Sequence, residues 1–177
     1  MSFNFCPFPV LETERLIIRE LNSNDTKAIF TLRTNKENNT FITRNIPKNL
    51  SETRAFIDVI SNLVSENKGL FWVIVSKINN ELIGTIGLRN FKDDDNYAEV
   101  GYELSPNYHQ KGFMSEALQK IINFGFSNLH LKTIEAFTHK NNIASKALLE
   151  KYNFIFQPER RDKGFDNNRI YKLVAKK

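Results

Sequence analysis

The stretch from Tyr97 to Glu116 (YAEVGYELSPNYHQKGFMSE) contains the residue types whose order best suits chemistry on an anionic ligand. A predicted strand ends there, a short loop follows, and a helix begins at Gly112. The first turn of a helix has backbone N–H groups without intrahelical partners and the positive end of the helix dipole, so it attracts phosphate groups. Gly112 lets an anion approach the backbone, while Gln110 and Lys111 add a donor and a positive charge. The stretch therefore predicts an anion site.

Other interpretations of this loop stay open at the level of sequence. A glycine at a helix start is also common as a simple cap. The loop lacks the Gly-Lys-Ser/Thr ending of a Walker motif and the three spaced glycines of a dinucleotide fingerprint. These two classes of nucleotide site are excluded, but phosphate binding through the backbone is not.

Hydrophobic periodicity predicts the elements that position the loop. The predicted strands span residues 16–21, 70–77, 81–90, 97–104, 133–138, 154–160 and 168–174. The predicted helices run from a capping sequence at 23–25 to Arg33, from a cap at Ser51 to a stop at Lys68 and Gly69, over 112–128, and over 143–152. This order predicts an α+β fold on one mixed sheet. Gly101, inside a strand, indicates a bulge or the close approach of a ligand.

Length and composition limit the class of protein. A chain of 177 residues with 41% hydrophobic residues suits a single domain over 1–177 with one core. One cysteine cannot build a disulfide framework. No apolar run approaches the roughly 18 residues of a membrane span, and the start lacks the pattern of a secretory signal. We therefore expect a cytoplasmic protein without a membrane partner.

The charge of the chain is mildly basic. The formal net charge is +5, and basic residues are densest over 160–177. A basic pI near 9.3 permits a nucleic-acid binder, but the charges of both signs interleave, so a weak field that attracts an anionic ligand or an ordinary solvated surface fits better. Asp93, Asp94 and Asp95 lack the alternating ligands and glycine of a calcium loop, so we expect no metal site.

Four segments, in order along the chain, resemble the GCN5-related N-acetyltransferase superfamily, and within it the branch of ribosomal-protein alanine and serine N-acetyltransferases. They are TERLIIREL from Thr13, AEVGYEL from Ala98, PNYHQKGFMSEAL from Pro106, and NIAS from Asn142 continuing to LLEKYNF. The resemblance implies a fold with a single mixed, mostly antiparallel sheet flanked by about four helices. It also implies acetyl-CoA as co-substrate and an amine as acceptor.

The resemblance further implies which residues act. It places cofactor contacts at Val100, Gly101, Tyr102, Leu104, His109, Gln110, Lys111, Gly112, Phe113, Met114, Ser115, Asn142 and Ser145. Glu99 is the first candidate for the general base, and it shares a strand face with Gly101 and Glu103. Ser145 is the candidate proton donor for the leaving thiolate, with Tyr152 in reserve. Asn142 contacts the cofactor or caps its helix.

Three positions differ from the common pattern of the family. His109 stands where Gln or Arg is usual, Met114 where a small residue is usual, and Asn153 where Gly is usual before Phe154. His109 and Met114, together with Leu149 where many other branches carry a donor Tyr, favour as an alternative a CoA-binding sensor or degenerate enzyme. Within the enzyme class, the acceptor is either a protein N-terminus or a small amine, walled by residues 34–51 and 162–168. Homodimer formation is also left open.

Overall fold

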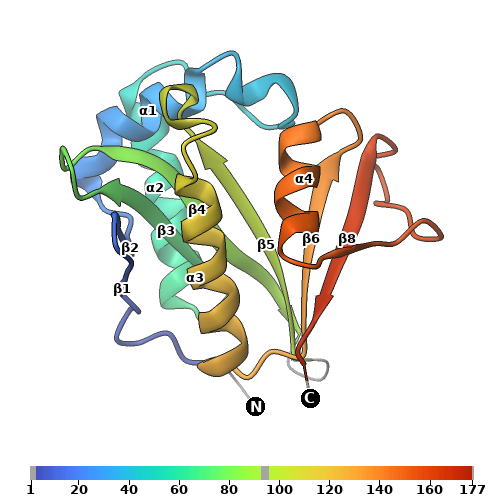
Figure 1. Cartoon of the computed structure of the whole chain (residues 1–177). Coiled ribbons are helices and arrows are strands. Elements are labelled where there is room, and N and C mark those ends of the chain that lie inside the picture. Colours follow the sequence, from blue (N-terminus) through green and yellow to red (C-terminus); the bar gives the residue numbers. More distant parts are fainter. Residues whose placement is uncertain (1–2, 93–95, 177) are drawn as a thin grey trace.

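The computed structural model describes residues 3–92 and 96–176, and these ranges form one eight-stranded sheet with helices on both faces (Figure 1). The strands are β1 (Leu11–Glu12), β2 (Leu16–Glu20), β3 (Gly69–Ser76), β4 (Leu82–Lys92), β5 (Tyr97–Leu104), β6 (Thr133–His139), β7 (Ile155–Phe156) and β8 (Asn168–Val174). The helices are α1 (Thr26–Thr34), α2 (Leu50–Ser65), α3 (Phe113–Ser127) and α4 (Ile143–Lys151), with short 3₁₀ turns η1 (Ser23–Asp25), η2 (Asn38–Thr40) and η3 (Pro106–Tyr108). The predicted α+β fold is confirmed.

Strand alternation divides the apolar residues between two cores, one on each face of the sheet. Trp72 and Ile74 of β3 belong to the larger core, which includes Leu118 and Ile121 of α3. Val73, between them in sequence, belongs to a smaller core formed with α1 and α2. The sheet therefore has an α3/α4 face and an α1/α2 face.

The sheet splits between β5 and β6, its parallel pair. Ladder pairing runs from Tyr97–Thr133 to Val100–Ala136, after which the two strands diverge (Figure 1). Beyond that point β5 stays paired with β4 as far as Leu104, and β6 stays paired with β8 as far as His139. Across residues 101–104 and 137–139, the facing edges of β5 and β6 thus have no ladder bonds to each other, and such edges can meet a ligand.

Most predicted elements form, with some corrections. The N-cap of α2 is Asn49 rather than Ser51, because the Asn49 side chain accepts a hydrogen bond from the Glu52 N–H. Asn153 has a φ of +63°, the left-handed conformation that glycine usually supplies at this helix end.

Two expectations for the strands were wrong. The predicted strand over 154–160 shortens to β7, since Pro158 lacks an N–H for a ladder. A bulge at Gly101 is also wrong, because the register of β4 and β5 is regular through Gly101 and shifts instead between Arg89 and Lys92. The alternative for Gly101, the close approach of a ligand, stays a prediction. Asp93, Asp94 and Asp95 lie outside the described residues.

Candidate functional site

The N-terminus of α3 is an open anion site. Gly112 is its N-cap residue, with a φ of +81° and no side-chain cap. Within residues 3–92 and 96–176, the backbone N–H groups of residues 112–115 donate no hydrogen bond. Gln110 also has a positive φ, of 59°, and alternation of this kind turns successive N–H groups into an anion-binding concavity. The loop can therefore bind phosphate through its backbone.

Most side chains of this loop point away from the anion site. Phe113 and Met114 are buried, so Met114 packs into the larger core and does not narrow the loop. His109 Nε2 lies 2.9 Å from the carbonyl oxygen of Leu104, and its Nδ1 lies 3.5 Å from Glu37. His109 thus joins the loop to the end of β5.

Tyr152 and Lys151 reach the first turn of α3 from the end of α4. The Tyr152 hydroxyl lies 2.8 Å from Ser115 Oγ and donates to the Ser115 carbonyl oxygen at 2.7 Å. Lys151 Nζ donates to Ser115 Oγ at 2.7 Å, and Lys111 Nζ donates to the Asn107 carbonyl. These contacts bring Tyr152 to the anion loop rather than to Ser145, and they place two ammonium groups beside the loop.

Ser145 meets Tyr102 on the α3/α4 face of the split. Their hydroxyl oxygens are 2.9 Å apart. Burial raises the pKa of Tyr102 to about 12, against a smaller lowering by the Ser145 hydrogen bond, so the phenol keeps its proton at neutral pH. The Asn142 side chain caps α4 by accepting from the Ser145 N–H at 3.1 Å. The start of α4 therefore fixes Ser145 beside a protonated phenol.

The β5 residues Val100, Gly101 and Leu104, predicted to contact the cofactor, face the split mainly with their main chain. Val100 and Leu104 are buried in the larger core, so a ligand between the strands meets their main chain. A Cβ atom added to Gly101 would have no heavy atom within 4 Å. Gly101 therefore borders open space on the α1/α2 face.

Glu99 lies on the α1/α2 face at the point where the strands begin to part. Its carboxylate accepts from Asn90 Nδ2 at 2.8 Å and from the Tyr97 hydroxyl at 3.3 Å, with Arg89 Nε at 3.6 Å. Burial, followed by the charges of Glu99 and Glu135, raises the pKa of Tyr97, which therefore remains a donor. Glu99 thus has one close hydrogen bond, from Asn90, and two longer contacts, with space beside it at Gly101.

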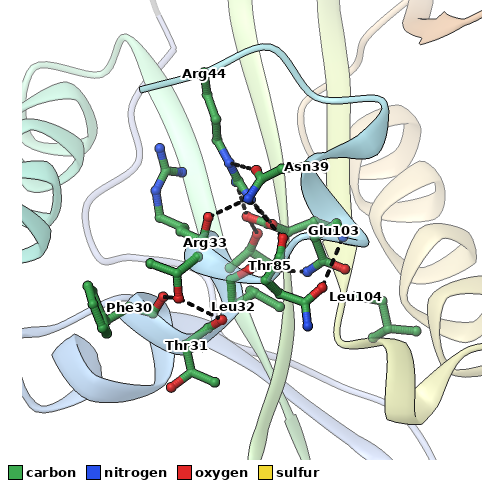
Figure 2. Close-up of polar contacts among 12 residues, drawn as sticks. Phe30, Thr31, Leu32, Arg33, Asn39, Arg44, Thr85, Glu103 and Leu104 are labelled. Atoms are coloured by element: carbon green, nitrogen blue, oxygen red, sulfur yellow. Dashed lines mark hydrogen bonds and ion pairs between the residues drawn. The ribbon is translucent and has the colours of Figure 1, made fainter. Parts of the chain in front are cut away.

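Glu103, on the same strand face, is fully engaged. Arg44 donates to both of its carboxylate oxygens at 2.8 Å, and the Thr85 hydroxyl lies 3.4 Å away (Figure 2). Only 11% of the Arg44 side chain and 8% of the Glu103 side chain are exposed. Of the two carboxylates on this strand face, Glu103 is therefore committed to Arg44, whereas Glu99 has no comparable two-oxygen ion pair.

The segment between α1 and α2 spans the split on the α1/α2 face. Asn39 Oδ1 accepts from Arg44 Nε at 2.8 Å within this segment, and the ion pair of Arg44 with Glu103 holds the segment above β5 (Figure 2). Phe41 stacks on His139 of β6, with ring centroids 5.3 Å apart. Sequence reasoning predicted this segment as a wall but missed Arg44, because no local pattern pairs an arginine with a carboxylate 59 residues away.

Together, the split sheet and the open helix start define an α+β protein with a candidate phosphate site beside its parted strands. Comparison with known proteins gives the family. The sequence model described as "Acetyltransferase (GNAT) domain" matches residues 15–155, and the chain belongs to this family of N-acetyltransferases. The chain is 36% identical over 147 residues, 83% of each protein, to the N-acetyltransferase YoaA of Bacillus subtilis, whose name marks it as uncharacterized.

Solved structures have the same fold. The ribosomal-protein-S5-alanine acetyltransferase of Vibrio fischeri superimposes with a TM-score of 0.81 and 20% identity, covering 94% of this chain and 96% of that one. The ribosomal L7/L12 α-N-protein acetyltransferase RimL, in complex with coenzyme A, superimposes with a TM-score of 0.80 and 16% identity. The match covers 94% of this chain and 98% of that one. At these identities the likeness concerns the fold.

Proposed function

We propose that the chain transfers the acetyl group of acetyl-CoA to a primary amine. The observation that carries this proposal is the set of unpaired N–H groups at residues 112–115, which lies beside the split between β5 and β6. Family membership and the coenzyme A complex of a protein with the same fold support it.

The residues present fit the cofactor. The backbone of residues 110–115, with Lys111 beside it, would hold the pyrophosphate. The edge of β5 from Gly101 to Leu104, which has no ladder partner in β6, would offer backbone groups for the amides of the pantetheine arm, apart from the Leu104 carbonyl that His109 contacts. No metal is needed for phosphate binding of this kind, because helix N–H groups and lysines supply the positive charge.

The reaction forms a C–N bond and breaks a C–S bond, and acetyl-CoA supplies the acetyl group as a thioester. Glu99, directly or through a water molecule, accepts the proton that the amine must lose. Ser145 would donate a proton toward the sulfur as the C–S bond breaks and regain one from the Tyr102 hydroxyl, 2.9 Å away. Solvent would return a proton to Tyr102, and Glu99 would release to solvent the proton taken from the amine, so the cycle balances. The amine approaches from the α1/α2 face, so the two reactants meet through the split.

The acceptor is proposed only as a class. Residues 34–51 and 162–168 wall the α1/α2 side, and a protein N-terminus or a small amine fits this arrangement. The name of the structurally similar Vibrio fischeri enzyme supports including ribosomal N-terminal peptides among the candidates.

Isothermal titration with acetyl-CoA tests the proposal first. We expect saturable binding, and no detectable heat at millimolar cofactor would refute it. A thiol-release assay with small amines and ribosomal N-terminal peptides then tests catalysis. Cofactor binding without thiol release across the whole panel would favour the alternative, a CoA-binding sensor, for which the unusual His109 is the sequence argument.

A further inference from the structure

A carboxylate in the first turn of α3 is held by a segment from the far end of the chain. Glu116 Oε1 accepts from the Arg15 backbone N–H at 2.9 Å and from the Thr13 hydroxyl. Its other oxygen, Oε2, accepts from Arg15 Nε at 2.7 Å. Burial opposes the charged form, but the hydrogen bonds from Thr13 and Arg15 prevail and hold the pKa of Glu116 below its usual value. Glu116 is therefore a fixed anion at neutral pH.

The same arginine contacts the loop on the other side of the helix start. Arg15 Nη1 donates to the Lys111 carbonyl oxygen at 3.0 Å, and its guanidinium carbon lies 4.4 Å from the centroid of the Phe113 ring. A Cβ atom added to Gly112 would lie 3.3 Å from Arg15 Nη2. One guanidinium thus fixes the backbone immediately before and after the free N–H groups.

The direction in which Glu116 points matters for the anion site. An acidic side chain in the first turn commonly turns back to bond the start of its own helix, as Asp25 does with the Asn22 N–H. Glu116 instead bonds to residues 13 and 15, so it leaves the N–H groups of its own helix free. Arg15 also offsets the charge that would otherwise repel a phosphate.

We propose that Arg15 is a positioning residue for the phosphate site: it holds residues 111–116 in the anion-binding conformation without itself bonding to the phosphates. The inference rests on the proposed function, since the anion is taken to be the pyrophosphate of acetyl-CoA.

Two acetyl donors test the role. S-acetylpantetheine has the thioester and pantetheine arm but no pyrophosphate. We expect Arg15→Gln to raise the KM for acetyl-CoA about tenfold or more, and to leave kcat/KM for S-acetylpantetheine within about twofold. Arg19→Gln is the matched control. The Arg19 side chain also pairs with a carboxylate, that of Asp25, and its exposed fraction of 32% is close to the 35% of Arg15. This variant should leave the KM for both donors unchanged.

Glu116→Gln separates positioning from direct contact. If Arg15 acts through the backbone, loss of the Glu116 charge loosens it and raises the KM for acetyl-CoA. If Arg15 bonds the phosphates itself, the same change frees the guanidinium and lowers that KM, which would overturn the inference. Arg15→Lys, which retains the charge but cannot bridge Glu116 and the Lys111 carbonyl together, should also raise the KM and replaces Arg15→Gln if that variant does not fold.

The outcomes distinguish the two proposals. Wild-type protein that neither binds nor turns over acetyl-CoA refutes the proposed function. The positioning role is overturned if the wild type is active and its Arg15 variants keep the normal KM for acetyl-CoA. It is also overturned if these variants lose kcat/KM equally for acetyl-CoA and S-acetylpantetheine. Either result leaves the proposed function intact.

Discussion

Helices α3 and α4 lie on the same face of the sheet, and both begin at the end where β5 and β6 have parted, yet their N-termini are built differently (Figure 1). Helix α4 starts at Asn142, whose side chain satisfies the Ser145 N–H. Helix α3 starts at Gly112, which offers no side chain to its helix. A capped start holds a hydroxyl in place, and an uncapped start leaves N–H groups for a ligand.

The open start forgoes a local source of stability. A side-chain cap contributes about 0.5–2 kcal/mol to helix or protein stability. Helix α3 has no such cap, and its first turn is fastened instead through Glu116 to Thr13 and Arg15. The chain thus stabilises the helix start from outside, which keeps the N–H groups of residues 112–115 accessible.

Giving α3 a capping side chain should have the largest effect. In Gly112→Asp, a carboxylate at the cap position accepts from the helix N–H groups, repels phosphate and strains a residue with positive φ. We expect the Kd for acetyl-CoA, measured by titration calorimetry, to rise about 100-fold or more.

Gly164→Asp is the control for backbone strain. Gly164 has a φ of +88° and no heavy atom within 4 Å of an added Cβ, so the substitution brings the same strain and charge without approaching the loop. Its Kd for acetyl-CoA should remain that of the wild type. Equal losses in both variants would show that strain, and not the anion site, explains the effect.

Removing the hydroxyl that α4 holds should have the next largest effect. Ser145→Ala deletes the proposed proton donor, and we expect kcat to fall at least about tenfold with little change in the KM for acetyl-CoA. Tyr152→Phe loses contacts to Ser115 at the other helix start, so it should raise KM instead. Steady-state kinetics with both variants checks this, and the reverse pattern would make Tyr152 the donor.

The sequence predicted the glycine start of α3 correctly because the information is local. The strand, loop and glycine at 97–116 are contiguous, and hydrophobic periods predict their neighbours. The contacts that hold the loops in place were not predicted, because they join residues far apart in sequence. They are the contact of Arg15 with Glu116, separated by 101 residues, and the contact of Phe41 with His139. Both members of the first pair stood in recognised motifs, but only the tertiary fold brings them into contact.

The fastening of α3 should also depend on pH. The pKa of Glu116 is lowered in the folded protein from an ordinary value of 4.5, so its ionised form stabilises the fold above that pH. This contribution disappears as the pH falls through the folded-state pKa. Glu116→Gln should therefore lower the free energy of unfolding by about 1 kcal/mol at pH 7, in view of the partly exposed Arg15 partner.

Urea unfolding of both proteins from pH 7 down to pH 3 measures this dependence. We expect the difference between them to shrink below about pH 4.5 as the wild-type carboxylate becomes protonated. A difference that stays constant over this range would mean that the hydrogen bonds to a neutral side chain, rather than the charge, fasten the helix.

The smallest effect should come from removing a side-chain cap, either at α2, where no ligand is expected, or at α4, beside Ser145. Asn49→Ala deletes the side chain that accepts from the Glu52 N–H at the start of α2, and Asn142→Ala deletes the cap of α4. Each should lower the free energy of unfolding by about 1 kcal/mol. Only Asn142→Ala should also lower kcat, because Ser145 then loses the bond that orients its helix turn toward Tyr102. If both variants lost activity equally, the cap of α4 would serve stability alone. Of the two helix starts on the α3/α4 face, only the start of α3 would then have a functional role.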